Sequence, residues 1–129
     1  SAMPSPLILH VLISEDFFQE RVVATTLALD EVPQVAQFDG DILSAVRAEP
    51  GSGIVLDLED EQFDSIEILK QIVKDEILAP LPLLTFCSPE CEETLQKAAA
   101  LGVVVTPRST FASNIVGMIK ALVQSEDPA

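Results

Sequence analysis

Three carboxylates in the sequence have the spacing of a site for a metal ion and a phosphoryl group. Glu15 and Asp16 end the apolar stretch at 7–14, and Asp57 lies near the end of the apolar segment GIVLDL at 53–58. Mg²⁺ binds through one or two carboxylates, water and phosphate oxygens, and a carboxylate beside it can act as a nucleophile toward a phosphoryl group. If the two stretches are neighbouring parallel strands, the acids converge and predict a Mg²⁺ site. Taken singly, each acid is better explained as a solvated charge at a strand end, and it is the coincidence of all three that favours a site.

The segments that would position these acids alternate in a regular way. Short, almost continuously apolar runs are typical of strands buried on both faces of a parallel sheet. The longer segments between them repeat their apolar residues at helical spacing. We expect strands at 7–14, 33–38, 53–58, 81–87 and 103–105, and helices at 17–29, 41–48, 65–78, 88–101 and 110–124.

This order predicts an α/β fold with three layers, a (βα)5 doubly wound parallel sheet with the flavodoxin-like strand order 2-1-3-4-5. Ligands of such sheets bind beyond the carboxyl ends of the strands. Asp16 is the expected N-cap of the first helix, Ser88 that of the fourth, and Gly102 the expected C-cap of the fourth. In the last helix we expect Phe111 and Val116 to point outward.

Composition excludes several classes of protein. The chain has 129 residues, 48% of them hydrophobic, which is enough for one domain with a real core. Its 21 acidic and 7 basic residues give a formal charge of −14, which would repel nucleic acid and anionic membranes. No apolar run approaches the roughly 20 residues that cross a bilayer. We therefore expect no direct nucleic-acid partner, no membrane partner and, with only two cysteines, a cytoplasmic location.

The ends of the chain differ from the rest in composition. Residues 1–3 have the appearance of a tag remnant followed by the start of the protein, and residues 125–129 are polar. We expect a single domain at 4–124, with 125–129 as a polar tail.

Several segments resemble one known family. VLISEDFFQER at 11–21 resembles the first strand and helix start of response-regulator receiver domains of the chemotaxis-regulator (CheY-like) type, in which a pair of acids follows the strand. FDSIEILKQI at 63–72 resembles the segment "MDGLELLRRI" of that family, and LPLLTFCSPECEETLQKAAALG at 81–102 resembles "IPVIMLTA…ALELGA". The resemblance covers nearly the whole chain. It implies that Asp57 is the candidate phospho-acceptor and that Glu15, Asp16 and Asp57 are the candidate Mg²⁺ ligands.

The departures from the family concern the phosphoryl-binding half of the site. Cys87 stands where the family has a Ser or Thr that binds a phosphoryl oxygen, and a thiol is a weak donor. Thr106 stands where the family has a lysine before the proline, and a hydroxyl cannot neutralise phosphoryl charge. Arg108 is the nearest base, on the other side of Pro107.

These observations predict an atypical receiver, or pseudo-receiver, that acts through protein-protein contacts with weak or no phosphorylation of Asp57. The implied partner is a signalling protein, either a histidine kinase or a downstream effector, and a homodimer is a further option. Enzymatic activity beyond self-phosphorylation is not expected. The first alternative is a phosphorylatable two-component receiver that uses Asp57 and Mg²⁺. The second is a small redox or enzyme module built on Cys87 or Cys91.

Other chemistry-bearing residues have ordinary interpretations. His10 lies within an apolar run, and we expect it to be a buried strand residue. Cys87 and Cys91 are too few to form a zinc site by themselves. The acid-rich segment 57–64 fits a solvated loop, with an acidic docking surface as the alternative.

Overall fold

Five parallel strands form a single sheet in the order β2-β1-β3-β4-β5, which confirms the predicted fold class. The computed structural model describes residues 7–124, so the expected tag remnant at 1–3 and polar tail at 125–129 lie outside the described residues. The strands are β1 (Ile8–Leu12), β2 (Val32–Val35), β3 (Gly53–Asp57), β4 (Leu83–Cys87) and β5 (Val105–Pro107).

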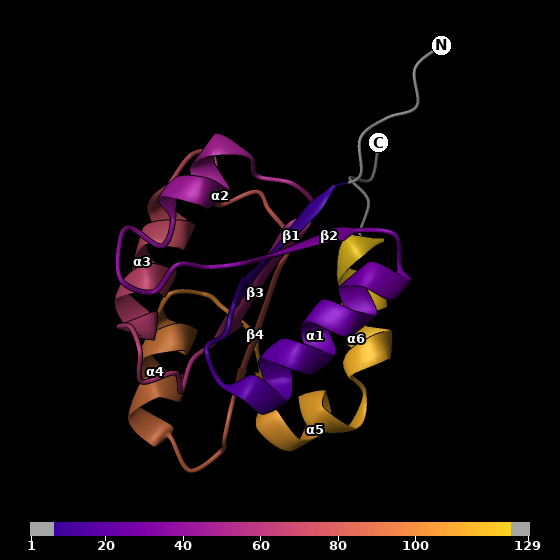
Figure 1. The fold of residues 1–129 in the computed structure, drawn as a ribbon. Coiled ribbons are helices and arrows are strands. Elements are labelled where there is room, and N and C mark those ends of the chain that lie inside the picture. Colours follow the sequence, from indigo (N-terminus) through magenta and orange to yellow (C-terminus); the bar gives the residue numbers. More distant parts are fainter. Residues whose placement is uncertain (1–6, 125–129) are drawn as a thin grey trace.

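Helices cover both faces of the sheet (Figure 1), as a parallel sheet requires. One face is covered by α1, α5 and α6, and the other by α2, α3 and α4. Their bounds are α1 (Asp16–Ala28), α2 (Ser44–Ala48), α3 (Ser65–Lys74), α4 (Glu92–Ala100), α5 (Arg108–Ser113) and α6 (Ile115–Val123). Among residues 7–124, no helix is long and apolar enough to span a membrane.

Two apolar clusters, one on each side of the sheet, form the core. Alternate residues of β3 and β4 enter different clusters: Leu56 and Cys87 face one, and Val55 and Phe86 face the other. Phe111 belongs to the second cluster and is fully buried, with its ring centroid 4.5 Å from that of Phe86. The expectation that Phe111 points outward is therefore wrong, because its ring fills the space between the end of β4 and α1.

The fourth helix and fifth strand both begin later than expected. The N–H of Cys91 donates to the carbonyl of Ser88, so residues 88–91 form a turn and α4 starts at Glu92. Gly102 ends this helix as predicted, with a φ of 77°. The N–H of Gly102 bonds to Ala99 and that of Val103 to Ala98, as in a Schellman motif. This exit uses Gly102 and Val103, and β5 begins only at Val105.

The last expected helix is divided in two. Asn114 has φ −148° and ψ 48°, which interrupts the helix between α5 and α6. Its N–H donates to the carbonyl of Phe111, and its own carbonyl accepts from Met118 in the new helix. Val116 is 62% exposed, as expected. The break separates Arg108 and Phe111, which lie in α5 directly after β5, from the longer helix α6.

Candidate functional site

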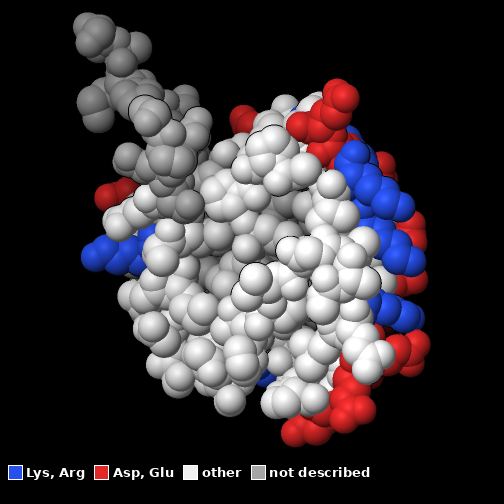
Figure 2. All heavy atoms as spheres, turned by 180° about the vertical axis from the view of Figure 1, so that it is seen from behind, with Lys and Arg blue, Asp and Glu red and all other residues white. Residues whose placement is uncertain are grey.

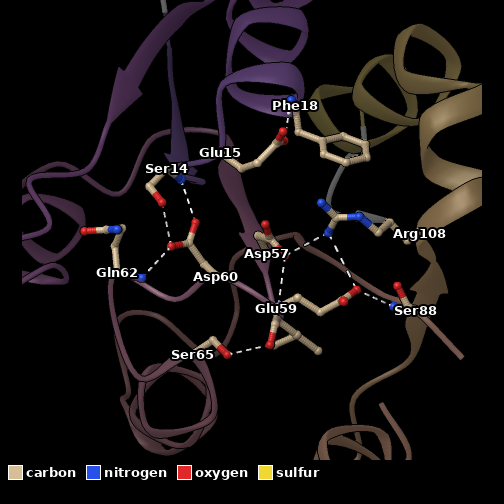
Figure 3. A network of polar contacts seen from close by, with 11 residues as sticks. Ser14, Glu15, Phe18, Asp57, Glu59, Asp60, Gln62, Ser65, Ser88 and Arg108 are labelled. Atoms are coloured by element: carbon tan, nitrogen blue, oxygen red, sulfur yellow. Dashed lines mark hydrogen bonds and ion pairs between the residues drawn. The ribbon is translucent and has the colours of Figure 1, made fainter. Parts of the chain in front are cut away.

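A cleft of about 370 Å³ opens at the carboxyl edge of the sheet, where the topology predicts a ligand site. It lies between the end of β1, the end of β3 and the first residue of α5 (Figure 3). Six acids and one arginine line it together with two uncharged polar residues: Ser14, Glu15, Asp16, Asp57, Glu59, Asp60, Glu61, Gln62 and Arg108. The three acids singled out in the sequence therefore do meet in one cleft.

Asp57 is the last residue of β3 and is 1% exposed. Its Oδ1 accepts a hydrogen bond from the N–H of Glu59 at 2.9 Å and lies 3.5 Å from Nη1 of Arg108. Burial raises the pKa of Asp57 to about 6, and the Glu59 N–H and the Arg108 charge only partly oppose this rise. The carboxyl group is ionised at neutral pH, yet its proton affinity is higher than that of an ordinary aspartate.

Arg108 supplies the positive charge of the cleft. The residue opens α5 directly after Pro107, which pairs with Cys87 at the ends of β5 and β4. Its guanidinium carbon lies 4.6 Å from the centroid of the Phe18 ring, a cation–π contact that directs the side chain toward the carboxylates. The sequence placed this arginine on the far side of Pro107 from the expected lysine position, and the structure nevertheless brings it to Asp57.

Glu59 lies across one side of the cleft (Figure 3). Its Oε1 accepts a hydrogen bond from the backbone N–H of Ser88 and lies 3.6 Å from Nη1 of Arg108. Burial raises the pKa of Glu59, but the hydrogen bonds from Ser88 and Cys91 and the charge of Arg108 outweigh it, so that the net pKa is below its usual value. The sequence places Glu59 at the end of the third expected strand, within the acid-rich segment 57–64, but assigns it no individual role; its spacing of two residues from Asp57 was the available signal.

Asp60 closes the other side of the cleft. Its carboxylate accepts hydrogen bonds from the N–H and the hydroxyl of Ser14, each at 2.6 Å, and from the N–H of Gln62. Asp64 caps α3 by accepting from the N–H of Glu67. Most of the acid-rich segment 57–64 therefore makes specific internal contacts, which a solvated loop would not need.

Glu15 and Asp16 also line the cleft, just before and at the start of α1, and both are exposed. Glu15 is the N-cap of α1, because its Oε2 accepts from the N–H of Phe18 at 3.1 Å. The prediction of Asp16 as N-cap is wrong: Asp16 is the first residue of the helix itself.

The donor chemistry of Glu15, Asp16 and Asp57 suits Mg²⁺, but these three carboxylates are not arranged around one common position. Glu15 is engaged by the helix end, and Asp57 by Arg108. Within residues 7–124, the group whose ligand atoms all lie within 4.8 Å of one another is instead Glu59, Cys87 and Cys91. No chemical step through Mg²⁺ follows from this arrangement.

Cys87 and Thr106 are not among the residues that line the cleft. Cys87 is buried in the apolar cluster on the α3 and α4 side, where burial, with the neighbouring Cys91, raises its pKa to about 12. Thr106 is half-buried in β5, opposite Phe86. His10 is buried, with Nε2 2.7 Å from the carbonyl oxygen of Glu49, as expected for a strand residue.

Comparison with solved structures places this arrangement among known folds. NtrX of Brucella abortus, in its complex with ADP, has a TM-score of 0.69 at 17% identity over 93% of this chain. The chemotaxis protein CheY4 of Vibrio cholerae has a TM-score of 0.69 at 13% identity over 91% of this chain and 98% of its own. The phosphorylated cyanobacterial phytochrome response regulator RcpA has a TM-score of 0.69 at 16% identity, over 96% of this chain and 99% of its own.

The chain has the receiver-domain fold. It spans only 27% of the length of the NtrX chain, whereas it matches nearly all of the other two structures. No family model matches the sequence, and no curated protein matches it. In this chain the fold carries, at the carboxyl edge of its sheet, the cleft that holds Asp57 and Arg108.

Proposed function

We propose that this chain is an atypical receiver domain that signals through protein contacts, with weak or no phosphorylation of Asp57. The observation that carries the proposal is the composition of the cleft around Asp57, which holds six acids and a single arginine. A phosphoryl group attached to Asp57 would enter a field of negative charge. Neither Cys87 nor Thr106, at the two positions that the family uses to bind this group, lines the cleft.

The proposed output is contact with another signalling protein. Figure 2 shows the back of the molecule, where a broad central area carries neither acidic nor basic side chains. From residue 98 to residue 119 the only charged residue is Arg108, whose guanidinium is engaged with Asp57. Val104 is 89% exposed and Val116 62% exposed in this segment. An uncharged surface of this kind suits a histidine kinase, a downstream effector or a second copy of the chain.

The second candidate is a phosphorylatable receiver. Asp57 ends β3, lines the cleft and has a cation 3.5 Å away, which is one requirement of phosphoryl transfer to a carboxylate. In this alternative Glu15, Asp16 and Asp57 would be the Mg²⁺ ligands, which requires an arrangement of these carboxylates other than the one observed.

One experiment separates the two candidates. The intact mass is measured after incubation with acetyl phosphate and Mg²⁺, with Asp57→Asn as the control and a chemotaxis receiver as the positive standard. The proposal expects no mass gain in this chain while the standard gains one phosphoryl group. A one-phosphoryl gain that disappears in Asp57→Asn would refute the proposal and establish the phosphorylatable receiver.

A further inference from the structure

Two groups in contact with Glu59 have the character of oxyanion donors. The backbone N–H of Ser88 emerges at the end of β4, one residue after Cys87, and the guanidinium of Arg108 emerges at the start of α5. Charge-assisted hydrogen bonds from backbone N–H groups and arginine are among the strongest contacts that an anion makes in a protein. A group bound to Asp57 would find both donors at the same edge of the sheet.

Both donors are already directed at one carboxylate, that of Glu59. Oε1 of Glu59 accepts from the N–H of Ser88 and lies 3.6 Å from Nη1 of Arg108. The same Nη1 lies 3.5 Å from Oδ1 of Asp57. A single arginine nitrogen therefore bridges the two carboxylates, and the Glu59 oxygen lies where a negatively charged group on Asp57 would seek its contacts (Figure 3).

The backbone holds Glu59 in this position. Its own N–H donates to Oδ1 of Asp57 at 2.9 Å, which turns the chain directly after β3. Ser65, at the start of α3, donates its hydroxyl to the carbonyl of Leu58 at 2.8 Å and fixes the residue between the two acids. The β3–α3 loop thereby positions the Glu59 carboxylate. The same carboxylate accepts the hydrogen bond from Ser88 and so restrains the β4–α4 loop.

We propose that Glu59 is a built-in anion that occupies the oxyanion donors of the cleft and holds the β4–α4 loop in one fixed conformation. The site it fills would otherwise accept a tetrahedral oxyanion of the phosphate class. This inference deepens and rests on the proposed function, since it gives the physical reason why Asp57 would be phosphorylated weakly and why the loop would not respond to that modification.

The test removes the carboxylate and then offers an anion in its place. Inorganic phosphate is titrated into ¹⁵N-labelled Asp57→Asn protein, with and without Glu59→Ala, and the amide resonance of Ser88 is followed. The Asp57→Asn background prevents covalent modification. With Glu59 present, the Ser88 resonance is expected far downfield and insensitive to phosphate. In Glu59→Ala the resonance is expected to move upfield, and phosphate is expected to move it back downfield in a saturable titration.

Two further variants separate the effect of freeing the donors from the effect of removing a negative charge. Glu61→Gln removes a charge from the same cleft, but Glu61 makes no contact with Ser88 or Arg108 among the hydrogen bonds and ion pairs of residues 7–124. This control should leave the Ser88 resonance unchanged in the absence of phosphate and should strengthen the phosphate response far less than Glu59→Ala does. Glu59→Gln keeps an oxygen that can accept from Ser88, so it should shift the resonance less than Glu59→Ala. It also serves as the folded variant if the alanine form does not fold.

The possible outcomes distinguish this inference from the proposed function. If Ser88 does not respond to phosphate in either Glu59 variant, or if Glu61→Gln has the same effect as Glu59→Ala, the role of Glu59 is refuted, whatever the state of Asp57. If acetyl phosphate modifies Asp57 in the unaltered chain, the proposed function fails, while a phosphate response confined to the Glu59 variants would still support the built-in anion.

Discussion

The guanidinium of Arg108 and the carboxylate of Asp57 lie 3.5 Å apart at the carboxyl edge of the sheet, although the two residues are separated by 51 positions in the sequence. Arg108 follows β5, Asp57 ends β3, and β4 lies between these strands. The pair places the one cation of the cleft against its most buried acid. The net charge at this edge of the sheet therefore depends on the position of Arg108, the first residue of α5.

Replacing Asp57 with asparagine should stabilise the protein at neutral pH. Because burial raises the folded-state pKa from 3.8 to about 6, the folded state binds more protons than the unfolded state across that interval. The free energy of unfolding therefore falls as pH rises from about 4 to about 6. One pKa unit corresponds to about 1.4 kcal/mol, so the upper limit is about 3 kcal/mol.

We expect Asp57→Asn to gain about 1–3 kcal/mol at pH 7.5, less than the limit because Arg108 loses its partner. The gain should shrink as pH falls from about 6 toward 4, because the folded-state carboxyl group becomes protonated over this interval and no longer carries a buried charge. Urea unfolding followed by far-UV circular dichroism measures this directly, which suits a chain without tryptophan or tyrosine. A gain of equal size at all pH values would contradict the raised pKa of Asp57.

Removing the arginine should raise the pKa of Asp57 further. The Arg108 charge lowers that pKa and also helps to lower the pKa of Glu59. We expect Arg108→Ala to move the Asp57 titration upward by about one pH unit. Carboxyl ¹³C NMR across pH 4–8 follows the titration of Asp57. Arg108→Lys keeps the charge and should retain part of the effect, and an unchanged Asp57 titration in Arg108→Ala would show that the ion pair is not formed in solution.

The two cysteines should be poor nucleophiles. Burial raises the pKa of the Cys87 thiol to about 12, so that only about 1 in 10,000 of these thiols is ionised at pH 8. Burial also raises the pKa of Cys91, which is half-buried. We expect iodoacetamide at pH 8 to modify Cys91 slowly in the folded protein and Cys87 only after denaturation. Intact mass of the Cys91→Ser variant isolates Cys87, and its rapid alkylation would revive the cysteine-based alternative.

Truncating the Phe111 side chain should strongly destabilise the folded protein. Its ring is fully buried and packs on Phe86 and Phe18 with centroid distances of 4.5 Å and 5.6 Å. Phe111→Ala should lower the free energy of unfolding by about 3–5 kcal/mol. Val116, five residues later in the same region, is exposed, and Val116→Ala should change it by less than about 0.5 kcal/mol. Equal effects in urea unfolding would mean that Phe111 does not pack as described.

Much of the fold follows from local properties of the sequence. The apolar runs and helical spacing predicted the number of strands, their parallel arrangement and the edge at which Asp57 lies. Gly102 predicted the end of α4, because a residue with positive φ favours glycine. The predicted boundaries failed where a tertiary contact competed with a local signal. Ser88, expected to cap α4, instead gives its N–H to Glu59.

The sequence by itself determined that Glu15, Asp16 and Asp57 reach the carboxyl edge, because that depends only on where each strand ends. Only the tertiary structure decided which groups contact them. Arg108 reaches Asp57 because the strand register sets Pro107 opposite Cys87, and Phe18 then supports the guanidinium. Glu59 reaches Ser88 because two loops far apart in the sequence meet at the ends of adjacent strands. Such contacts depend on register and on loop conformation, which no local pattern of residues encodes.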